Sequence, residues 1–261
     1  MSTVKKESEK FADSLIFEGM TSISAVINSP ITNNRKIEKV FYDSSKEKSK
    51  KKELDFLRFK AKEMSFELVS VSSDVIDEKT VGNSHGGIIA LCSDRNIELL
   101  SKSQDNLKKD GFYVMIEGIE DPYNFGYALR SLYAAGVDGV ILSKRNWMGA
   151  TGVVSRASAG ASEMLTMYVD DDGKCAEIFK QLGYKVICAG IRNSVSIYDA
   201  DMRTPVFLII GGEKRGISST LISQADEIVR IDYASNFKGS LSAASSAAII
   251  GFEIMRQNKK L

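Results

Sequence analysis

The sequence has few cysteines and histidines, the residues that stabilise small folds through disulfides or bound metal ions. Among 261 residues it has three cysteines, far apart, and one histidine, so it offers neither a disulfide framework nor a paired-cysteine zinc or redox motif. We therefore expect no metal site and a reducing compartment. Prolines number only three, while hydrophobic residues make up 43% and charged residues 26% of the chain, which is typical of a globular protein.

Long apolar runs are also missing. The chain starts with Met1 and a polar, charged stretch, and no window of ~18 residues is uninterruptedly apolar. We expect a protein that is neither secreted nor membrane-spanning and that acts in the cytoplasm.

A strong overall charge is absent, because 35 Lys plus Arg oppose 34 Asp plus Glu and leave a formal net charge of +1. Locally the balance differs. Residues 35–62 contain eleven Lys or Arg and five Asp or Glu, an excess of six, centred on Lys46, Lys48, Lys50, Lys51 and Lys52. Clustered cations raise affinity for phosphate. A solvated lysine-rich helix start or loop explains such a run equally well.

The length allows one large domain or two modest ones, and the pattern favours two. In the first half we predict strands at 37–42, 66–71 and 87–92 and a helix at 53–64, which make a small α/β domain. The chain then becomes polar. We place an N-terminal domain at 1–97, a linker at 98–110 and a larger domain at 111–261.

Beyond Gly111 the pattern is regular. Apolar strands alternate with segments of helical spacing, which predicts an α/β fold with a mainly parallel sheet and helices on both faces. The predicted strands are 112–116, 139–142, 185–189, 206–210 and 227–231, and residues 240–257 are predicted to form a C-terminal helix.

Ligands of open α/β sheets bind at the carboxyl ends of the strands, so polar side chains in the loops there are candidates for a site. The first such loop spans 121–130. In it Asn124 stands at a plausible helix N-cap and Arg130 follows one to two turns later. The alternative is a capping turn with an ordinary surface arginine.

The second loop, 211–216, follows an apolar strand. Gly211 and Gly212 would let a ligand or another backbone approach closely, and Glu213 places a carboxylate at the strand end. The loop matches neither the dinucleotide-binding glycine fingerprint nor a phosphate loop, which disfavours a dehydrogenase or NTPase. The third loop runs from Ile231 to Ser242 and leads into the small-residue start of the last helix, which also fits simple close packing.

Together, in this order, the three loops resemble the signature motifs of the SpoU (TrmH-type) family of the SPOUT superfamily. The first resembles Asn-x-Gly-x-x-x-Arg, and the second matches Gly-x-Glu-x-x-Gly. The third is similar to a Ser-Leu-Asn-x-Ser motif at the start of a helix that has a Phe-Glu pair near its end, here Phe252-Glu253. Residues 156–161 resemble the family's Ser-x-Gly-Ala stretch. The first half is similar to a small ribosomal-protein-like domain that binds substrate in such enzymes, with Gly19 near its start and residues 85–88 near its end.

The resemblance implies a C-terminal trefoil knot, homodimerisation, and S-adenosylmethionine as the donor of a methyl group to RNA, most often to a ribose 2'-hydroxyl. The RNA could be ribosomal or transfer RNA, and base methylation stays open. Arg130 could act as a base or position an RNA phosphate, and positioning is favoured because a guanidinium stays protonated. The residues that the resemblance assigns to catalysis or substrate orientation are Arg130, Asn124 and Glu213, and those that it assigns to the cofactor are Gly190, Gly211, Gly212, Ile231, Leu241 and Ser242.

The third motif departs from the family pattern. Ser242 stands where the family has Asn, Ala244 replaces a Ser, and Asp232-Tyr233 replaces Pro-Met in a loop about one residue longer. A second hypothesis is therefore a catalytically weak RNA-binding member of the fold, and a third is an α/β enzyme that uses another nucleotide.

Three further residues have ordinary explanations. His85 is expected to be a turn residue, Trp147 a packing residue and Cys188 part of an apolar core.

Overall fold

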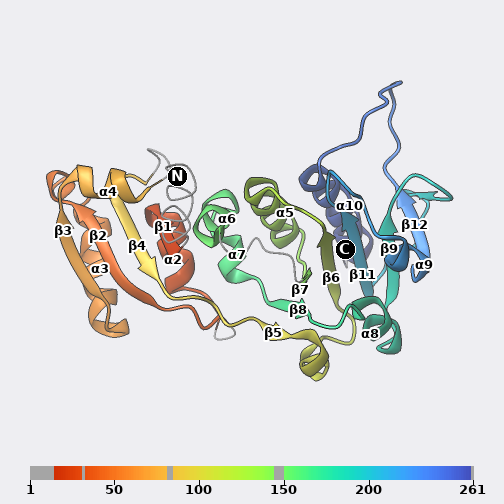
Figure 1. The fold of residues 1–261 in the computed structure, drawn as a ribbon, viewed down its shortest axis with the longest axis horizontal. Helices are drawn as coiled ribbons and strands as arrows, with labels where there is room; N and C mark the ends of the chain where they lie inside the picture. Colours follow the sequence, from red (N-terminus) through yellow and green to blue (C-terminus); the bar gives the residue numbers. More distant parts are fainter. Residues whose placement is uncertain (1–14, 31–32, 81–84, 144–149, 260–261) are drawn as a thin grey trace, which may run out of the picture. The chain divides into compact units, whose positions relative to one another are not determined.

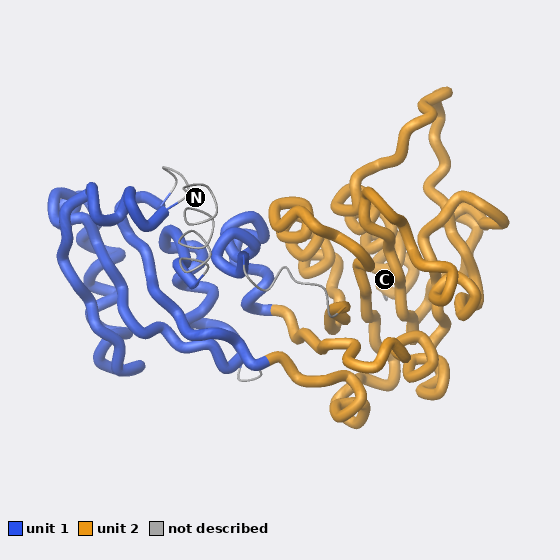
Figure 2. The backbone as a smooth tube through the Cα atoms, in the orientation of Figure 1, with its two compact units in different colours: residues 1–96, 147–164 blue, residues 97–146, 165–261 orange. Residues whose placement is uncertain are grey.

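The computed structural model describes residues 15–30, 33–80, 85–143 and 150–259. The chain divides into two compact units, shown in two colours in Figure 2: residues 1–96 with 147–164, and residues 97–146 with 165–261. We call these unit 1 and unit 2 and describe each by itself. Trp147 lies outside the described residues.

Unit 1 is built on a small mixed sheet with the strand order β1-β4-β2-β3 (Figure 1). Strands β2 and β3 are parallel, and the other two pairs are antiparallel. Its elements are β1 (Ile16–Glu18), α2 (Gly19–Ile27), β2 (Ile37–Asp43), α3 (Lys51–Met64), β3 (Glu67–Val71), α4 (Ser73–Lys79), β4 (Ile88–Cys92), α6 (Thr151–Ala157) and α7 (Ala161–Met164). The predicted strands and helix of the first half are thereby confirmed.

Unit 2 contains an eight-stranded sheet, with the order β10-β12-β9-β11-β6-β7-β8-β5, in which every adjacent pair is parallel. Its strands are β5 (Glu98–Leu99), β6 (Phe112–Glu117), β7 (Gly139–Ser143), β8 (Met167–Asp170), β9 (Lys185–Ala189), β10 (Val195–Ser196), β11 (Val206–Gly211) and β12 (Glu227–Arg230). Its α-helices are α5 (Pro122–Ala134), α8 (Cys175–Gln181), α9 (Ser219–Ser223) and α10 (Ala243–Asn258). The prediction of an α/β fold with a parallel sheet is confirmed.

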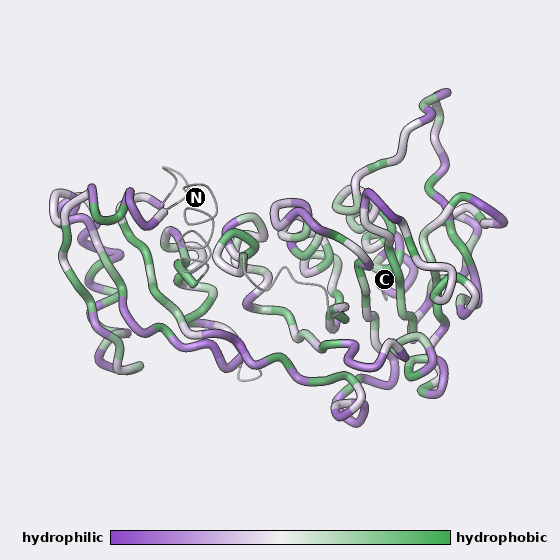
Figure 3. The backbone as a smooth tube through the Cα atoms, in the orientation of Figure 1, coloured by the Kyte–Doolittle hydropathy of each residue, from purple (hydrophilic) through white to green (hydrophobic). Residues whose placement is uncertain are grey.

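The central strands of unit 2 are buried on both faces. On β6, Tyr113 and Met115 point into a core that includes Phe179 of α8, while the alternate residue Val114 is fully buried on the opposite face. Helix α10 packs against α5 and β11. Figure 3 shows the hydrophobic residues concentrated in the strands of this sheet. Because both faces of the sheet are buried, these strands are continuous apolar runs and do not alternate between apolar and polar residues.

Residues 150–164 belong to unit 1 although they lie between two strands of unit 2 in the sequence. The carboxylate of Glu163 on α7 is buried and accepts from Arg35 Nε at 2.9 Å and from Asn33 Nδ2 at 2.8 Å. Arg156 of α6 forms an ion pair with buried Glu18. A Cβ on Gly160 would lie 2.5 Å from Ala25 Cβ, so the Ser-x-Gly-Ala stretch packs tightly on α2.

The chain's three cysteines are free and buried, as expected for Cys188. Burial raises the pKa of both Cys92 and Cys188 to about 12, which leaves them protonated and inert at neutral pH. Among the described residues no helix is long and apolar enough to cross a membrane.

The buried Arg35–Glu163 pair generates a stability prediction. Glu163→Ala would leave the Arg35 guanidinium buried without its carboxylate, and removing one partner of a buried pair costs about 3–5 kcal/mol. Urea unfolding should show this loss in unit 1. The matched control is Glu63→Ala, which removes the exposed Lys60–Glu63 pair and should cost at most about 1 kcal/mol. Equal, small losses for both variants would contradict the structural role of Glu163.

Candidate active site

The carboxyl ends of three neighbouring parallel strands, β9, β11 and β12, meet at one edge of the sheet in unit 2. The loops that follow them, with the start of α10, enclose a cavity of about 610 Å³. At such an edge the loops present polar side chains and backbone groups to a ligand, because the hydrogen bonds of the strands are already made within the sheet. This cavity is the candidate site.

Helix α5 begins beside this edge. Its N-cap is Asp121, whose carboxylate accepts from Tyr123 N at 3.1 Å and from Asn124 N at 3.3 Å, and Pro122 occupies the first helical position. The prediction that Asn124 caps the helix is therefore wrong. Because Asp121 does the capping, the Asn124 side chain is free to reach another element.

Asn124 and Glu213 meet although they are far apart in the sequence. Asn124 Nδ2 donates to Glu213 Oε1 at 2.6 Å, which ties the first turn of α5 to the loop after β11. Glu213 lines the cavity. Arg130 lies six residues beyond Asn124, about 9 Å along the helix axis, and is exposed outside the cavity wall. The structure thus brings together two of the three residues assigned to catalysis or substrate orientation.

Gly211 and Gly212 are required by close approaches of backbone to backbone. A Cβ on Gly211 would lie 2.6 Å from the Gly216 carbonyl carbon, and one on Gly212 would lie 2.4 Å from the Gly118 oxygen. Gly212 N also donates to Glu117 O at 2.6 Å. The paired glycines therefore allow a close approach of the chain's own backbone. The contact joins the loop after β6 to the loop after β11.

The third loop is held at both of its ends. Asp232 accepts from Arg230 Nε at 2.7 Å, and hydrogen bonds from Ser196 and Arg230 hold the pKa of Asp232 below its usual value. Ser242 is the N-cap of α10, and its Oγ accepts from Ser245 N at 3.1 Å. The Tyr233 hydroxyl accepts from Leu241 N at 3.1 Å.

Most residues assigned to the cofactor share one cavity wall. The predicted residues that line it are Gly190, Gly211, Gly212, Ile231 and Leu241. Ser242 is not in the wall, because its side chain caps α10. Their roles in binding stay predictions.

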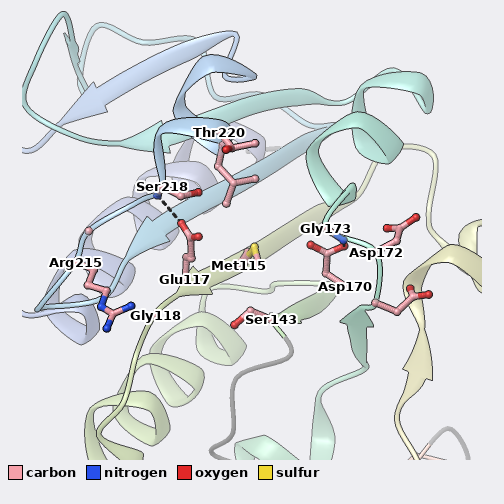
Figure 4. A pocket seen from close by; sticks show the side chains of 13 residues that line it. Met115, Glu117, Gly118, Ser143, Asp170, Asp172, Gly173, Arg215, Ser218 and Thr220 are labelled. Atoms are coloured by element: carbon pink, nitrogen blue, oxygen red, sulfur yellow. Dashed lines mark hydrogen bonds between the residues drawn. The ribbon is translucent and has the colours of Figure 1, made fainter.

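A second cavity, of about 660 Å³, lies at the ends of β6, β7 and β8 and is shown in Figure 4. Glu117 accepts from Ser218 N at 2.7 Å on one wall, while Asp170 and Asp172 lie on the other. Burial raises the pKa of Asp170. Gly216 lines both cavities, so the loop after β11 separates them, with Glu213 toward the first and Arg215 toward the second.

Carboxylates dominate this second cavity, which makes it a poor site for a phosphate backbone. Among the described residues no group of three or more His, Cys, Asp or Glu could hold a metal ion.

Sequence reasoning missed several residues of the site. Asp121 had a usable signal, since an Asp directly before a Pro is a typical helix start. Phe237, Lys238 and Ser246 line the first cavity without belonging to any motif. Only the fold places them there.

These features define an α/β protein of parallel topology whose ligand cavity is built from the loops after three adjacent strands. The profile of the SpoU rRNA Methylase family matches residues 111–252, more than half of the chain. The chain belongs to the SpoU rRNA Methylase family.

Similar proteins agree with this membership. The chain is 28% identical over 202 residues to the 23S rRNA (guanosine-2'-O-)-methyltransferase RlmB of Shewanella oneidensis, which covers 76% of this chain and 82% of that protein. The fold is similar to that of an AdoMet-bound rRNA methyltransferase from Sinorhizobium meliloti, with a TM-score of 0.79, 21% identity and coverage of 97% and 95% of the two chains. It is also similar to the SpoU methyltransferase AviRb from Streptomyces viridochromogenes in complex with AdoMet, with a TM-score of 0.75, 20% identity and coverage of 95% and 97%.

The contact of Gly212 with Gly118 generates a prediction. Gly212→Ala would force the two loops apart, since backbone atoms cannot yield as side chains do, and overpacking of this kind costs about 1–3 kcal/mol. Denaturant unfolding would measure the loss. Gly190→Ala is the matched control, because its Cβ would meet only the Cγ2 methyl of Ile228 at 3.1 Å. The account fails if the two variants lose the same stability.

Proposed function

We propose that this protein transfers a methyl group from S-adenosylmethionine to RNA, and that the acceptor is a ribose 2'-hydroxyl. The observation that carries the proposal is the contact between Asn124 and Glu213 at the cavity whose wall contains five of the six residues assigned to the cofactor. Family membership supports it, as do the RNA methyltransferase named among the relatives and the AdoMet-bound structures of similar fold.

The cavity fits such a cofactor. Its volume of about 610 Å³ falls within the ~300–1,000 Å³ that small-molecule sites occupy. Gly190, Gly211 and Gly212 expose backbone rather than side chains, and Ile231, Leu241 and Ile250 add apolar surface. Backbone donors and acceptors with apolar walls suit an adenine ring, which is flat and carries hydrogen-bonding edges.

Bound S-adenosylmethionine would supply an electrophilic methyl group on a sulfonium. The chain's own contribution is to align the acceptor with it, since alignment of reacting centres accounts for much of the rate in such reactions. Glu213 is held by Asn124 through Oε1, and its Oε2 can accept a hydrogen bond from a substrate hydroxyl. Arg130 would position an RNA phosphate.

The changes in the third motif are compatible with activity. Ser and Asn are both strong N-cap residues, and Ser242 caps α10 in the expected way. The start of α10 and the backbone of the cavity are therefore kept without the amide side chain. This favours the methyltransferase over a member of the fold that only binds RNA.

We further propose the family's trefoil knot in the C-terminal segment and a homodimer. Support for the dimer comes from exposed aromatic rings on the two helices that pack together. Tyr123, Tyr127 and Arg130 are spaced i, i+4 and i+7 and so share an exposed face of α5, and Phe252 is exposed on α10. A second copy covering these rings would bury apolar surface next to Arg130.

Unit 1 is proposed to bind the RNA outside the reacting nucleotide. Lys50 is the N-cap of α3, and Lys51 and Lys52 occupy its first turn. Lys50 pairs with Glu53 at 3.0 Å. Cations at a helix N-terminus are unfavourable by about 0.3–1 kcal/mol each, so folding alone does not account for Lys51 and Lys52. A phosphate backbone would reverse the sign of that contribution. We propose the cytoplasm as the place of action, where such RNA is found.

The role of Arg130 is tested by substitution. Arg130→Ala should abolish RNA methylation, measured with radiolabelled methyl donor, while the affinity for S-adenosylmethionine by calorimetry stays the same. Arg130→Lys, which keeps the charge, should recover part of the activity if the side chain holds a phosphate. Arg203→Ala removes an exposed arginine before the amino end of β11 and serves as the control. Full turnover by Arg130→Ala would refute the assignment.

The role of the lysine run is tested by salt dependence. Replacing Lys48, Lys51 and Lys52 with Ala should lower the slope of log K against log salt by roughly 1 for each lost phosphate contact. The control replaces the exposed unit 2 residues Lys102, Lys109 and Lys174. Identical slopes in wild type and the triple variant would exclude this surface from RNA binding.

A further inference from the structure

The loop between β12 and α10, residues 231–242, carries two exposed aromatic rings. Figure 1 shows this loop projecting away from the sheet of unit 2. Tyr233 is 39% exposed and Phe237 is 57% exposed, yet both line the cavity that also contains Glu213. Their ring centroids are 5.9 Å apart at an interplanar angle of 42°. The rings thus form a pair at the mouth of the proposed cofactor site.

Both rings lie against other parts of the same loop. The Tyr233 hydroxyl accepts from Leu241 N at 3.1 Å, which fixes the far end of that ring. The Phe237 ring lies against the backbone of Gly239, where an added Cβ would be 2.5 Å from its Cζ. A side chain at residue 239 would displace the Phe237 ring from this position.

Two charged residues flank the pair in this loop, Asp232 before Tyr233 and Lys238 after Phe237. Lys238 follows Phe237, lines the same cavity and is exposed, and among the described residues it forms no ion pair. Arg230, in contrast, is paired with Asp232. An uncompensated cation next to two exposed rings complements a ligand that has both an aromatic face and a negative charge.

We propose that Tyr233 and Phe237 form a stacking platform for an unpaired base of the RNA substrate, with Lys238 binding the phosphate of that nucleotide. The inference rests on the proposed function and specifies its substrate as a nucleotide outside a duplex. Sequence-tolerant stacking on aromatic side chains is how proteins hold single-stranded RNA. A paired base has its faces covered by its neighbours and cannot occupy the platform.

The cofactor is a poorer occupant of this position. S-adenosylmethionine carries a sulfonium and an ammonium against a single carboxylate, so its net positive charge makes it a weaker partner for Lys238 than an RNA phosphate. The glycine and aliphatic residues of the cavity already provide a wall for its adenine, and Phe237 keeps more than half of its surface in solvent at the outer rim. An RNA base approaching the donor from solvent would meet these rings first.

The experiment titrates the full chain, without cofactor, into a short single-stranded RNA that contains 2-aminopurine, whose fluorescence is quenched by stacking. The same strand in a duplex is the second probe. We expect Phe237→Ala to weaken binding of the single strand about ten-fold or more. Phe237→Trp should restore it, and the duplex should bind wild type and variant equally. Tyr198→Ala removes an equally exposed ring that does not line the cavity, and it should change nothing.

Two results would overturn the platform. One is single-strand binding by Phe237→Ala that equals that of wild type. The other is a calorimetric loss of S-adenosylmethionine binding by Phe237→Ala as large as its loss of RNA binding, which would make the ring part of the cofactor site. Cofactor titration of the wild-type protein tests the proposed function separately. The RNA titration needs no cofactor, so it tests the stacking platform whether or not the wild-type protein binds S-adenosylmethionine.

Discussion

The site depends on one close approach of backbone to backbone. Gly212 lies so near to Gly118 that no side chain fits between them, and this contact joins the loops after β6 and β11. With the two loops in contact, the first turn of α5 can reach Glu213 through Asn124. The parallel register of β6 and β11 places both strand ends at the same edge. Gly212 of the second motif is thus required for the two loops to form the site, independently of any contact with a ligand.

Much of the fold could be predicted because buried parallel strands leave a strong signal. Runs such as 112–116 and 206–210 are apolar throughout, and both proved to be strands. Strand β8, Met167–Asp170, was not predicted. The packing of residues 150–164 on unit 1 was also invisible. It depends on the pairing of Glu163 with Arg35, and a single sequence gives no sign of contacts between such distant residues.

The part of the site that could be predicted consists of motif residues that also meet in the structure. Asn124 and Glu213 belong to separate sequence motifs, and the structure joins them by a hydrogen bond. Capping, however, is decided by local backbone geometry, which gave the N-cap of α5 to Asp121 and turned Ser242 into the cap of α10. Residues of the cavity rim such as Phe237 belong to no motif. The two cavities also differ in charge in a way that composition hides, since the chain's net charge is only +1.

The central claim is methyl transfer to RNA, and mass spectrometry of nucleosides tests it most directly. RNA from cells that lack this gene would be incubated with the purified protein and S-adenosylmethionine, digested to nucleosides and compared with RNA incubated without protein. The account predicts one new 2'-O-methylated nucleoside that appears only when protein and methyl donor are both present. A protein that binds S-adenosylmethionine yet leaves the nucleoside profile of that RNA unchanged would contradict it.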